Sequence, residues 1–359
     1  MLKNELIKKL HLKYPIVQAP MAGGVTTSQL VAAVSNSGGL GMIGAGYLSP
    51  AKMRTQIQEI KKLTSNTFGV NLFVPEEFKI RAEQVESVNQ LLNPFRTCLN
   101  LPQQEQTEIP SFHHVLETFK EQIQVVINEQ VTVCSFTFGI PSKEFITELK
   151  QQNIILIGTA TTVKEAIENE KAGMDIVVVQ GSEAGGHRGS FIDEDNEGLV
   201  GLMSLIPQVV DQVNIPVIAA GGIMDARGLM ASLCLGAEGI QMGTAFLTCI
   251  ESGAHPVHKD AILQAADDQT VITRAFSGKP ARGIHNQFIA DMRNQELEVA
   301  EFPIQNTLTQ DIRRAASAQN NSEFMSLWSG QSASLAKKQT VKELMKSLIA
   351  EAKKMNLNF

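Results

Sequence analysis

The sequence predicts an α/β fold, a closed (β/α)8 TIM barrel with a helical insertion and a C-terminal helical extension. Eight short apolar runs recur along the chain, rich in Val and Ile and without alternating polar residues. Continuous apolar strands are typical of a parallel sheet that is covered on both faces. Helical patterns lie between these runs, and eight such alternations favour a closed barrel over an open doubly wound sheet, which is the alternative architecture.

The predicted strands are residues 15–20, 40–45, 68–74, 131–139, 154–160, 175–181, 215–222 and 239–244. Helical patterns follow four of them, at residues 27–37, 50–63, 162–171 and 225–234. The first of these helices ends before a glycine pair, which is a common stop signal. Ser49 is suited to cap the second helix, and Pro50 is suited to its first position.

Two stretches do not fit a bare barrel. Residues 75–130 are too long for one crossover, so we expect at least two helices there, separated by a loop with prolines and a Gln/Glu-rich stretch at 103–108. Residues 251–359 suggest loops and then helices, ending in an amphipathic helix at 341–354. We therefore predict a barrel over residues 1–250 and a C-terminal region that caps its mouth and contributes substrate contacts.

Composition and charge favour small-molecule ligands. The 359 residues are 43% hydrophobic, enough for a full core, and their net charge is -6 without any block of Lys or Arg. This pattern lacks the electrostatic footprint of nucleic-acid binding. The N-terminus lacks the apolar core of a signal peptide, and no run approaches the length of a membrane span. We therefore expect a cytoplasmic protein with neither nucleic-acid nor membrane partners.

Neither the cysteines nor the histidine pairs suggest a metal site. Cys134, Cys234 and Cys249 lie in apolar stretches without metal or disulfide spacing, so we expect buried, unreactive thiols, as suits a reducing compartment. His255 and His258 also lack metal-ligand spacing, and so does the pair at 113–114. We expect these histidines to be solvated loop or helix-end residues.

The strongest candidate for chemistry is the segment QGSEAGGHRGS, which follows the sixth predicted strand. Residues that follow barrel strands line the catalytic face. Gly185 and Gly186 would allow the backbone to approach a ligand closely and to present N–H groups. His187 titrates near neutral pH and can accept or donate a proton. A surface histidine in a flexible glycine loop is the alternative interpretation.

The seventh and eighth predicted strands end in segments suited to phosphate. Such barrels often bind phosphate there through backbone N–H groups. Gly221 and Gly222 follow the seventh strand, and Gly243 and Thr244 follow the eighth, where these donors are needed. Tight turns without a ligand are the alternative.

Three other residues raise the question of a ligand. Met21, at the end of the first strand, can pack against a flat ring, although a core position is the more common role. Asn71 lies in an otherwise apolar strand, and its amide needs partners, either a ligand or a neighbouring backbone group. Gln180 raises the same question at the end of the sixth strand.

A match to G-x-G-x-x-G at residues 39–44 does not indicate a Rossmann site. The dinucleotide fingerprint requires a strand before it and a helix that starts on it. Here the match follows a predicted helix and overlaps a predicted strand. We therefore assign these glycines to the barrel.

The chain resembles the nitronate monooxygenase family, formerly called 2-nitropropane dioxygenases, in the ordered segments PIVQAPMAGGVTT, GGLGMIGAG, FGVNLFVP, QGSEAGGHRGS, IPVIAAGGI and GAEGIQMGTAFL. A later segment, LWSGQSASLAK, resembles the C-terminal part of the bacterial class I branch. Each segment is weak alone, but the ordered set over residues 14–338 is specific.

The resemblance implies an FMN barrel that oxidises alkyl nitronates with O2 to a carbonyl compound and nitrite. It suggests that the enzyme detoxifies propionate 3-nitronate. A homodimer is possible. His187 matches the active-site histidine, Met21 matches a position near the isoalloxazine, and Asn71 and Gln180 resemble residues that contact the flavin. The resemblance assigns backbone and phosphate contacts to Gly185, Gly222, Gln241, Met242, Gly243 and Thr244. Gly186 and Gly221 complete the candidate cofactor site.

One departure concerns tyrosines, which the class I branch carries near its substrate. This chain has only Tyr14 and Tyr47, neither of them in the C-terminal part, so Trp328 or phenylalanines should shape the pocket.

Other functions remain as alternatives. FMN-dependent enoyl-acyl-carrier-protein reductases share the barrel motifs but use NADH or NADPH; Arg188, the insertion and the LWSGQ segment favour the monooxygenase. A ligand-binding barrel without turnover would not require His187. An aldolase or isomerase would need a Lys or an acid pair at strand ends, which we do not find.

Overall fold

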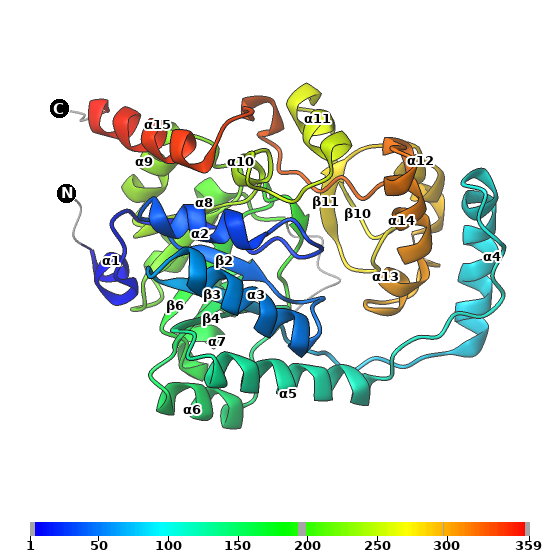
Figure 1. Ribbon diagram of the computed structural model, residues 1–359, viewed down its shortest axis with the longest axis horizontal. Coiled ribbons are helices and arrows are strands. Elements are labelled where there is room, and N and C mark those ends of the chain that lie inside the picture. Colours follow the sequence, from blue (N-terminus) through cyan, green and yellow to red (C-terminus); the bar gives the residue numbers. More distant parts are fainter. Residues whose placement is uncertain (1–3, 193–198, 297, 356–359) are drawn as a thin grey trace.

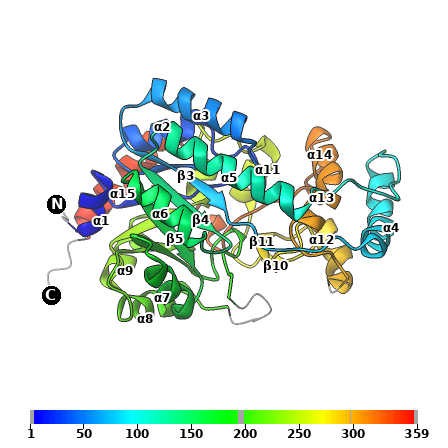
Figure 2. The same cartoon turned by 90° about the horizontal axis from the view of Figure 1, so that it is seen from below.

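A barrel of eight parallel strands forms the centre of the structure, a computed structural model that describes residues 4–192, 199–296 and 298–355 (Figures 1 and 2). The strands are β1 (Ile16–Gln18), β2 (Gly41–Gly44), β3 (Phe68–Phe73), β4 (Val133–Thr137), β5 (Ile155–Ala160), β6 (Ile176–Gln180), β8 (Val217–Ala220) and β9 (Gly239–Met242). Their order is β1-β9-β8-β6-β5-β4-β3-β2, and a parallel bridge between Val17 and Leu40 joins the two ends. The predicted (β/α)8 barrel is confirmed, and each strand lies within its predicted run.

Helices cover the outside of the barrel. The ring consists of α2 (Ser28–Asn36), α3 (Pro50–Leu63), α5 (Phe112–Asn128), α6 (Lys143–Gln151), α7 (Val163–Ala172), α8 (Leu202–Val210), α9 (Ala226–Cys234) and α15 (Val341–Lys354). The side chains of Thr27, Ser49 and Thr162 each accept a hydrogen bond from the backbone N–H three residues later, which fixes where α2, α3 and α7 begin. The four predicted ring helices are confirmed to within one residue.

The eighth ring helix comes from the far end of the chain. After β9 and the short α10 (Thr244–Leu247), the chain leaves the barrel and returns only at α15, which packs against α9 and α2 (Figure 1). α15 begins with a capping box between Thr340 and Glu343 and buries Leu344, Met345 and Leu348. The predicted helix at 341–354 is confirmed. The division of the chain at residue 250 stays a prediction, and it includes residues outside the described ranges.

Residues 251–296 and 298–340 form a layer over one end of the barrel, which we call the C-terminal layer (Figures 1 and 2). Its elements are α11 (Pro256–Gln264), β10 (Thr270–Thr273), β11 (Ala281–Ile284), α12 (Gln287–Met292), η1 (Arg293–Gln295), α13 (Ile304–Leu308), α14 (Gln310–Ala318), η2 (Ser322–Phe324) and η3 (Ala333–Leu335). β7 (Gly186–His187) leaves the barrel to pair with β11. α1 (Glu5–Leu10) instead packs Leu6 and Leu10 against side chains of the barrel strands.

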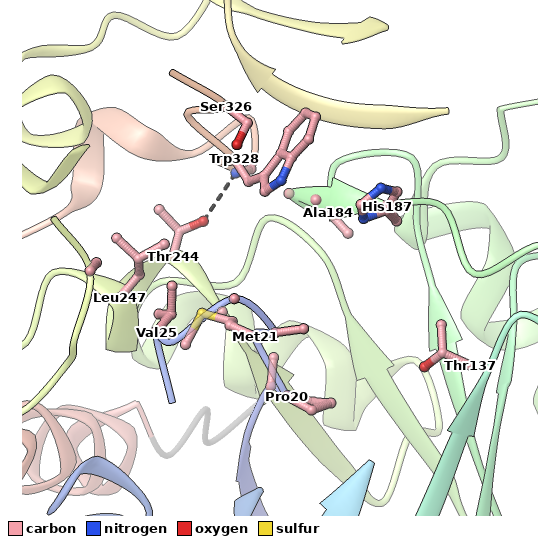
Figure 3. A pocket seen from close by; sticks show the side chains of 18 of the residues that line it. Pro20, Met21, Val25, Thr137, Ala184, His187, Thr244, Leu247, Ser326 and Trp328 are labelled. Atoms are coloured by element: carbon pink, nitrogen blue, oxygen red, sulfur yellow. Dashed lines mark hydrogen bonds between the residues drawn. The ribbon is translucent and has the colours of Figure 1, made fainter. Parts of the chain in front are cut away.

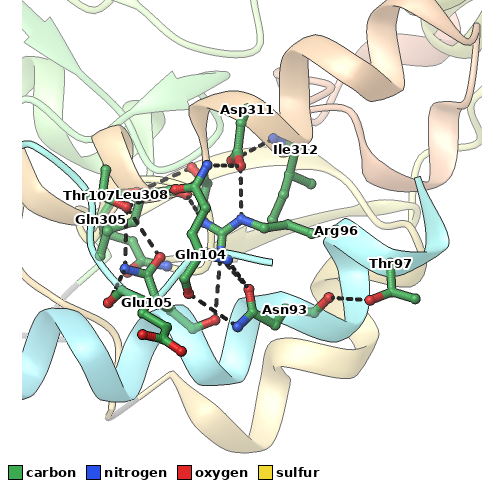
Figure 4. Close-up of polar contacts among 12 residues, drawn as sticks. Asn93, Arg96, Thr97, Gln104, Glu105, Thr107, Gln305, Leu308, Asp311 and Ile312 are labelled. Atoms are coloured by element: carbon green, nitrogen blue, oxygen red, sulfur yellow. Dashed lines mark hydrogen bonds and ion pairs between the residues drawn. The ribbon is translucent and has the colours of Figure 1, made fainter. Parts of the chain in front are cut away.

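The segment between β3 and β4 holds two helices, as expected. α5 joins the ring, whereas α4 (Ala82–Cys98) lies beyond α12 and α14 (Figures 1 and 2). The fully buried Arg96 of α4 donates to Asp311 at 2.8 Å and to the carbonyl of Leu308 at 2.9 Å (Figure 4). This polar network and a shared apolar core fasten α4 to the C-terminal layer.

The structure tests two expectations from the sequence, the burial of the cysteines and the place of the G-x-G-x-x-G match. Cys134 and Cys249 are buried, but Cys98 and Cys234 are exposed, so the expectation of a buried thiol at Cys234 is wrong. Cys234 ends α9, and an apolar neighbourhood in sequence does not reveal which face of a helix is buried. The last four residues of the G-x-G-x-x-G match form β2, which confirms that the match overlaps a barrel strand. Among the described residues, none of the helices has both the length and the apolar character needed to cross a membrane.

Candidate active site

A cavity of about 830 Å³ opens where the barrel strands end, below the C-terminal layer (Figure 3). The structure brings most of the predicted site residues into its wall: Met21, Asn71, Gln180, Gly185, Gly186, His187, Gly221, Gly222, Gln241, Gly243 and Thr244. Met242 lies outside this lining. Its side chain is buried in the core, and its carbonyl accepts from the N–H of Ala19 at 2.8 Å.

His187 is fixed by a strand pairing. It lies opposite Ala281 in the antiparallel pair of β7 and β11, and the N–H of Arg188 donates to the carbonyl of Pro280 at 2.8 Å. The buried guanidinium of Arg188 donates to the carbonyl of Gly181 at 2.6 Å, which ties the two ends of the loop together. His187 is therefore part of a sheet, and a flexible surface loop is not what the structure shows.

A serine determines which nitrogen of the His187 ring carries the proton. Nε2 lies 2.8 Å from Oγ of Ser277, and that hydroxyl donates to the carbonyl of Lys279 at 3.2 Å. With the single hydroxyl hydrogen directed at that carbonyl, Oγ accepts from Nε2–H, and Nδ1 keeps its lone pair. We assign this tautomer from the hydrogen-bond network.

Aromatic rings surround His187 and hold it uncharged. Its ring centroid lies 5.4 Å from that of Trp328, 5.8 Å from Phe138 and 6.1 Å from Phe302. Burial, together with the positive charges of Arg313 and Lys279, lowers the pKa of His187 to about 3. At neutral pH the imidazole is therefore neutral, and one ring nitrogen carries a lone pair that can accept a hydrogen bond.

The C-terminal segment touches the histidine loop so closely that only glycine fits at residue 185. A Cβ at Gly185 would lie 2.5 Å from the backbone N of Gly330 and 2.5 Å from the carbonyl carbon of Ser329. Oγ1 of Thr244 accepts from the N–H of Gly330 at 3.0 Å, the bond drawn in Figure 3. The LWSGQ segment is thus joined to the ends of both β6 and β9.

Backbone donors remain free at the ends of β8 and β9. Within the described chain, the N–H groups of Gly222, Gly243 and Thr244 have no acceptor. Gly222 has a φ of 65°, the left-handed conformation that favours glycine, and the hydroxyl of Ser332 lies on the same wall. Free N–H groups at these two strand ends fit an anionic group such as phosphate.

The two candidate amides have different surroundings. Asn71 donates through Nδ2 to Ser135 at 2.8 Å and to Thr137 at 3.1 Å, so neighbouring hydroxyls satisfy its donors and its Oδ1 stays available to the cavity. Gln180 donates to the carbonyl of His187 at 2.9 Å and accepts from the N–H of Gly189 at 2.8 Å. Gln180 therefore shapes the loop that carries His187.

The charges in the cavity wall have one sign. Lys52, Arg313 and Arg314 line it, and no Asp or Glu does so among the described residues. Such a wall attracts anions.

The sequence did not reveal three residues of this wall. Tyr47 follows β2 and packs its ring edge-on against Phe73, with centroids 5.3 Å apart. His258 is buried, and its Nε2 lies 2.9 Å from the carbonyl oxygen of Trp328, so the expectation of a solvated residue is wrong there. His255 does cap a helix, α11, as expected. Position after a strand would have indicated Tyr47, whereas no local signal points to His258 or Arg313.

Fold and site together define a TIM-barrel enzyme with a cavity suited to anionic ligands. The family model described as "Nitronate monooxygenase" matches residues 4–351. The chain belongs to the nitronate monooxygenase family, which is a family of flavin-dependent oxidoreductases.

Known proteins resemble this chain over almost their whole length. A "Probable nitronate monooxygenase" of Staphylococcus haemolyticus is 54% identical, covering 98% of this chain and 97% of that protein. Its counterpart in Staphylococcus aureus strain Newman is 52% identical, with coverage of 97% and 96%. Among solved structures, nitroalkane oxidase from Streptomyces ansochromogenes is 37% identical with a TM-score of 0.90, covering 98% of both chains. FabK from Thermotoga maritima is 32% identical with a TM-score of 0.78, covering 99% of this chain and 97% of that one.

Proposed function

We propose that this protein is an FMN-dependent enzyme that oxidises alkyl nitronates with O2 to a carbonyl compound and nitrite. Propionate 3-nitronate is the substrate we propose, and its detoxification is the role. The observation that carries this proposal is a neutral His187 in a cavity whose wall has cations and no acid among the described residues. A nitronate is an anion, and such a wall favours its binding. It remains a prediction that the protein is located in the cytoplasm, and so does the possible homodimer.

The cavity offers residues suited to FMN. The free N–H groups of Gly222, Gly243 and Thr244 would bind its phosphate, and Met21 and Asn71 would contact the ring system. When bound, the flavin supplies the capacity to accept electrons from the substrate, and the protein supplies orientation and electrostatics. Gln180 supports this site indirectly, through the position of His187.

The tautomer of His187 indicates its part. Nε2–H is bonded to Ser277, so the ring offers a lone pair on Nδ1. A lone pair does not neutralise an anion; the positive charges of the cavity wall instead favour the entry of a nitronate. Toward a neutral nitroalkane, the same lone pair can remove the acidic proton on carbon as a general base.

Anaerobic spectroscopy of the purified protein tests this function. We expect a yellow protein whose flavin absorbance is bleached by propionate 3-nitronate but by neither NADH nor NADPH. Rapid bleaching by a pyridine nucleotide alone would favour an enoyl reductase. A colourless protein that cannot be reconstituted with FMN would exclude both functions.

A further inference from the structure

One cation of the cavity wall has hydrogen bonds but no counter-charge. Arg313, on α14, donates through Nε to the hydroxyl of Thr309 at 3.2 Å. Its Nη2 donates to the carbonyl of Asn306 at 2.6 Å and to the side-chain oxygen of the same residue at 2.9 Å. All of these acceptors are neutral, and they fix the orientation of the guanidinium without cancelling its charge.

The other end of this guanidinium is free. Within the described ranges, Nη1 of Arg313 has no hydrogen-bond acceptor and no carboxylate lies within 4.0 Å of the group. Asp311, on the same helix, is bonded to Arg96 at 2.8 Å and to Gln104 at 3.0 Å (Figure 4). Two N–H donors and a full charge are therefore left for a ligand.

The other cations near the cavity are either exposed to water or close to a carboxylate. Lys52 and Arg314 are exposed, so water screens their charges. Lys279 is buried, but its ammonium lies 3.8 Å from a carboxylate oxygen of Glu76. Arg313 is partly buried, and desolvation lowers its pKa, which indicates that its charge acts in a poorly hydrated place.

Arg313 also lies on a side of the barrel mouth that a ligand next to His187 can reach. Arg313 lines the same cavity as Tyr47, which follows β2, and His187, which follows β6. The free N–H groups suited to phosphate lie instead at the ends of β8 and β9. A ligand next to His187 can therefore extend toward Arg313 without competing for those donors.

We propose that Arg313 is the specificity residue of this site, and that the two free Nη1–H groups bind a carboxylate on the far end of the substrate. This inference rests on the proposed function and deepens it: the preferred substrates are dianions, nitronates that carry a carboxylate a short chain away. Charge-assisted hydrogen bonds to a carboxylate are the stronger kind, and they provide the counter-charge that the chain itself lacks.

Binding of two unreactive acids tests the assignment without turnover. Succinate has the shape of propionate 3-nitronate with carbon in place of nitrogen, and butyrate lacks the second carboxylate. We would measure dissociation constants by titration calorimetry on the purified, flavin-loaded protein. The wild type should bind succinate about 10- to 100-fold more tightly than butyrate. Equal binding of the two acids by the wild type would overturn the proposal without any variant.

Two substitutions in the C-terminal layer locate the effect. Arg313→Gln should remove the preference for succinate, whereas Arg293→Gln, which deletes the same charge at an exposed residue outside the cavity lining, should retain it. Equal losses in both variants would show that net charge alone acts, and would reject a specific contact. Arg313→Lys keeps the charge without the second donor pair of the guanidinium. It should retain only part of the preference, and it guards against a folding defect in the glutamine variant.

Turnover separates this proposal from the function on which it rests. Arg313→Gln should raise KM for propionate 3-nitronate about 10- to 100-fold at similar kcat, and should change KM for the nitronate of 3-nitropropanamide far less. If the wild type oxidises no nitronate but prefers succinate, the proposed function fails and the anion site stands. If it oxidises both nitronates alike and binds both acids alike, the assignment of Arg313 fails alone.

Discussion

His187 differs from an ordinary histidine in two respects that have separate causes. The bond between Nε2 and Ser277 fixes its tautomer, and burial among aromatic rings with nearby cations lowers its pKa to about 3. Both features come from the C-terminal layer, which supplies Ser277, Phe302, Trp328 and Arg313. The residue was predictable from its glycine-rich segment, and an aromatic wall with Trp328 from the missing tyrosines, but Ser277 and Arg313 were not, because they lie far along the chain and leave no local signal.

Replacing His187 by Asn tests the role of a base. We expect kcat/KM for neutral nitroalkanes to fall about 100-fold or more, because general-base catalysis is lost. Pre-formed nitronates need no deprotonation, so their loss should be clearly smaller. Steady-state rates with both forms of the same compound give the comparison, and equal losses would refute the base.

The pKa of His187 also predicts how stability depends on pH. Folding lowers this pKa from its ordinary value of about 6.5, so the unfolded chain binds more protons in the interval between the two values. The stabilisation is complete above that ordinary value and is lost as pH falls toward the folded value. His187→Asn should therefore lose less Tm than the wild type between pH 7 and pH 5.

The exposed His114 offers the matched control for that comparison. His114→Asn should follow the wild-type dependence of Tm on pH. His258, whose pKa burial lowers to about 4, contributes with the same sign in all three proteins and cancels. An unchanged slope in His187→Asn would show that His187 titrates normally in the folded protein.

At the scale of elements, the site depends on the contact between the histidine loop and the C-terminal segment. Gly185→Ala would place a methyl group 2.5 Å from backbone atoms of residues 329 and 330, which cannot move independently of β6 and β9. We expect a loss of about 1–3 kcal/mol in the free energy of unfolding and a lower flavin content after purification. Denaturant unfolding and the ratio of absorbance at 450 and 280 nm would measure the two effects.

Gly201 provides a milder substitution for the same assays. An added methyl there meets one atom within 4 Å, Oε1 of Glu183 at 3.4 Å. Gly201→Ala should therefore retain flavin, with at most about 1 kcal/mol lost because Ala is a poor N-cap for α8. Similar flavin loss in both variants would mean that the close contact at Gly185 is not what matters.

Elements differ in how far sequence could predict them. The strands and the Ser49 cap of α3 follow from signals a few residues long, which is why they were correct. The position of Arg313 depends on how α13 and α14 pack over the barrel mouth, and the burial of His258 depends on the Trp328 carbonyl. Neither contact leaves a local pattern, so both could be found only in three dimensions.

At the scale of the whole molecule, a buried arginine joins the insertion to the layer that carries Arg313. Arg96→Ala would leave Asp311 with only Gln104 as a side-chain donor and the carbonyl of Leu308 without its donor (Figure 4). Removing one member of a buried ion pair costs about 3 kcal/mol or more, so we expect a clear fall in Tm by calorimetry. Arg227→Ala breaks an ion pair with Asp225 whose arginine is 66% exposed, and should cost less than about 1 kcal/mol. Similar shifts in Tm for both would mean that the Arg96 network adds little stability.

The place of α15 in the ring has a consequence for how the protein is made. On the ribosome, every residue that lines the cavity emerges before α15, the helix that completes the outer ring. A nascent chain ending before residue 341 would leave open the gap between α2 and α9, where Leu344, Met345 and Leu348 later pack against Leu30, Val34 and Leu229. The exposed apolar seam is the kind of surface that chaperones bind during synthesis, and completion of the helical ring is a late event in the life of each chain.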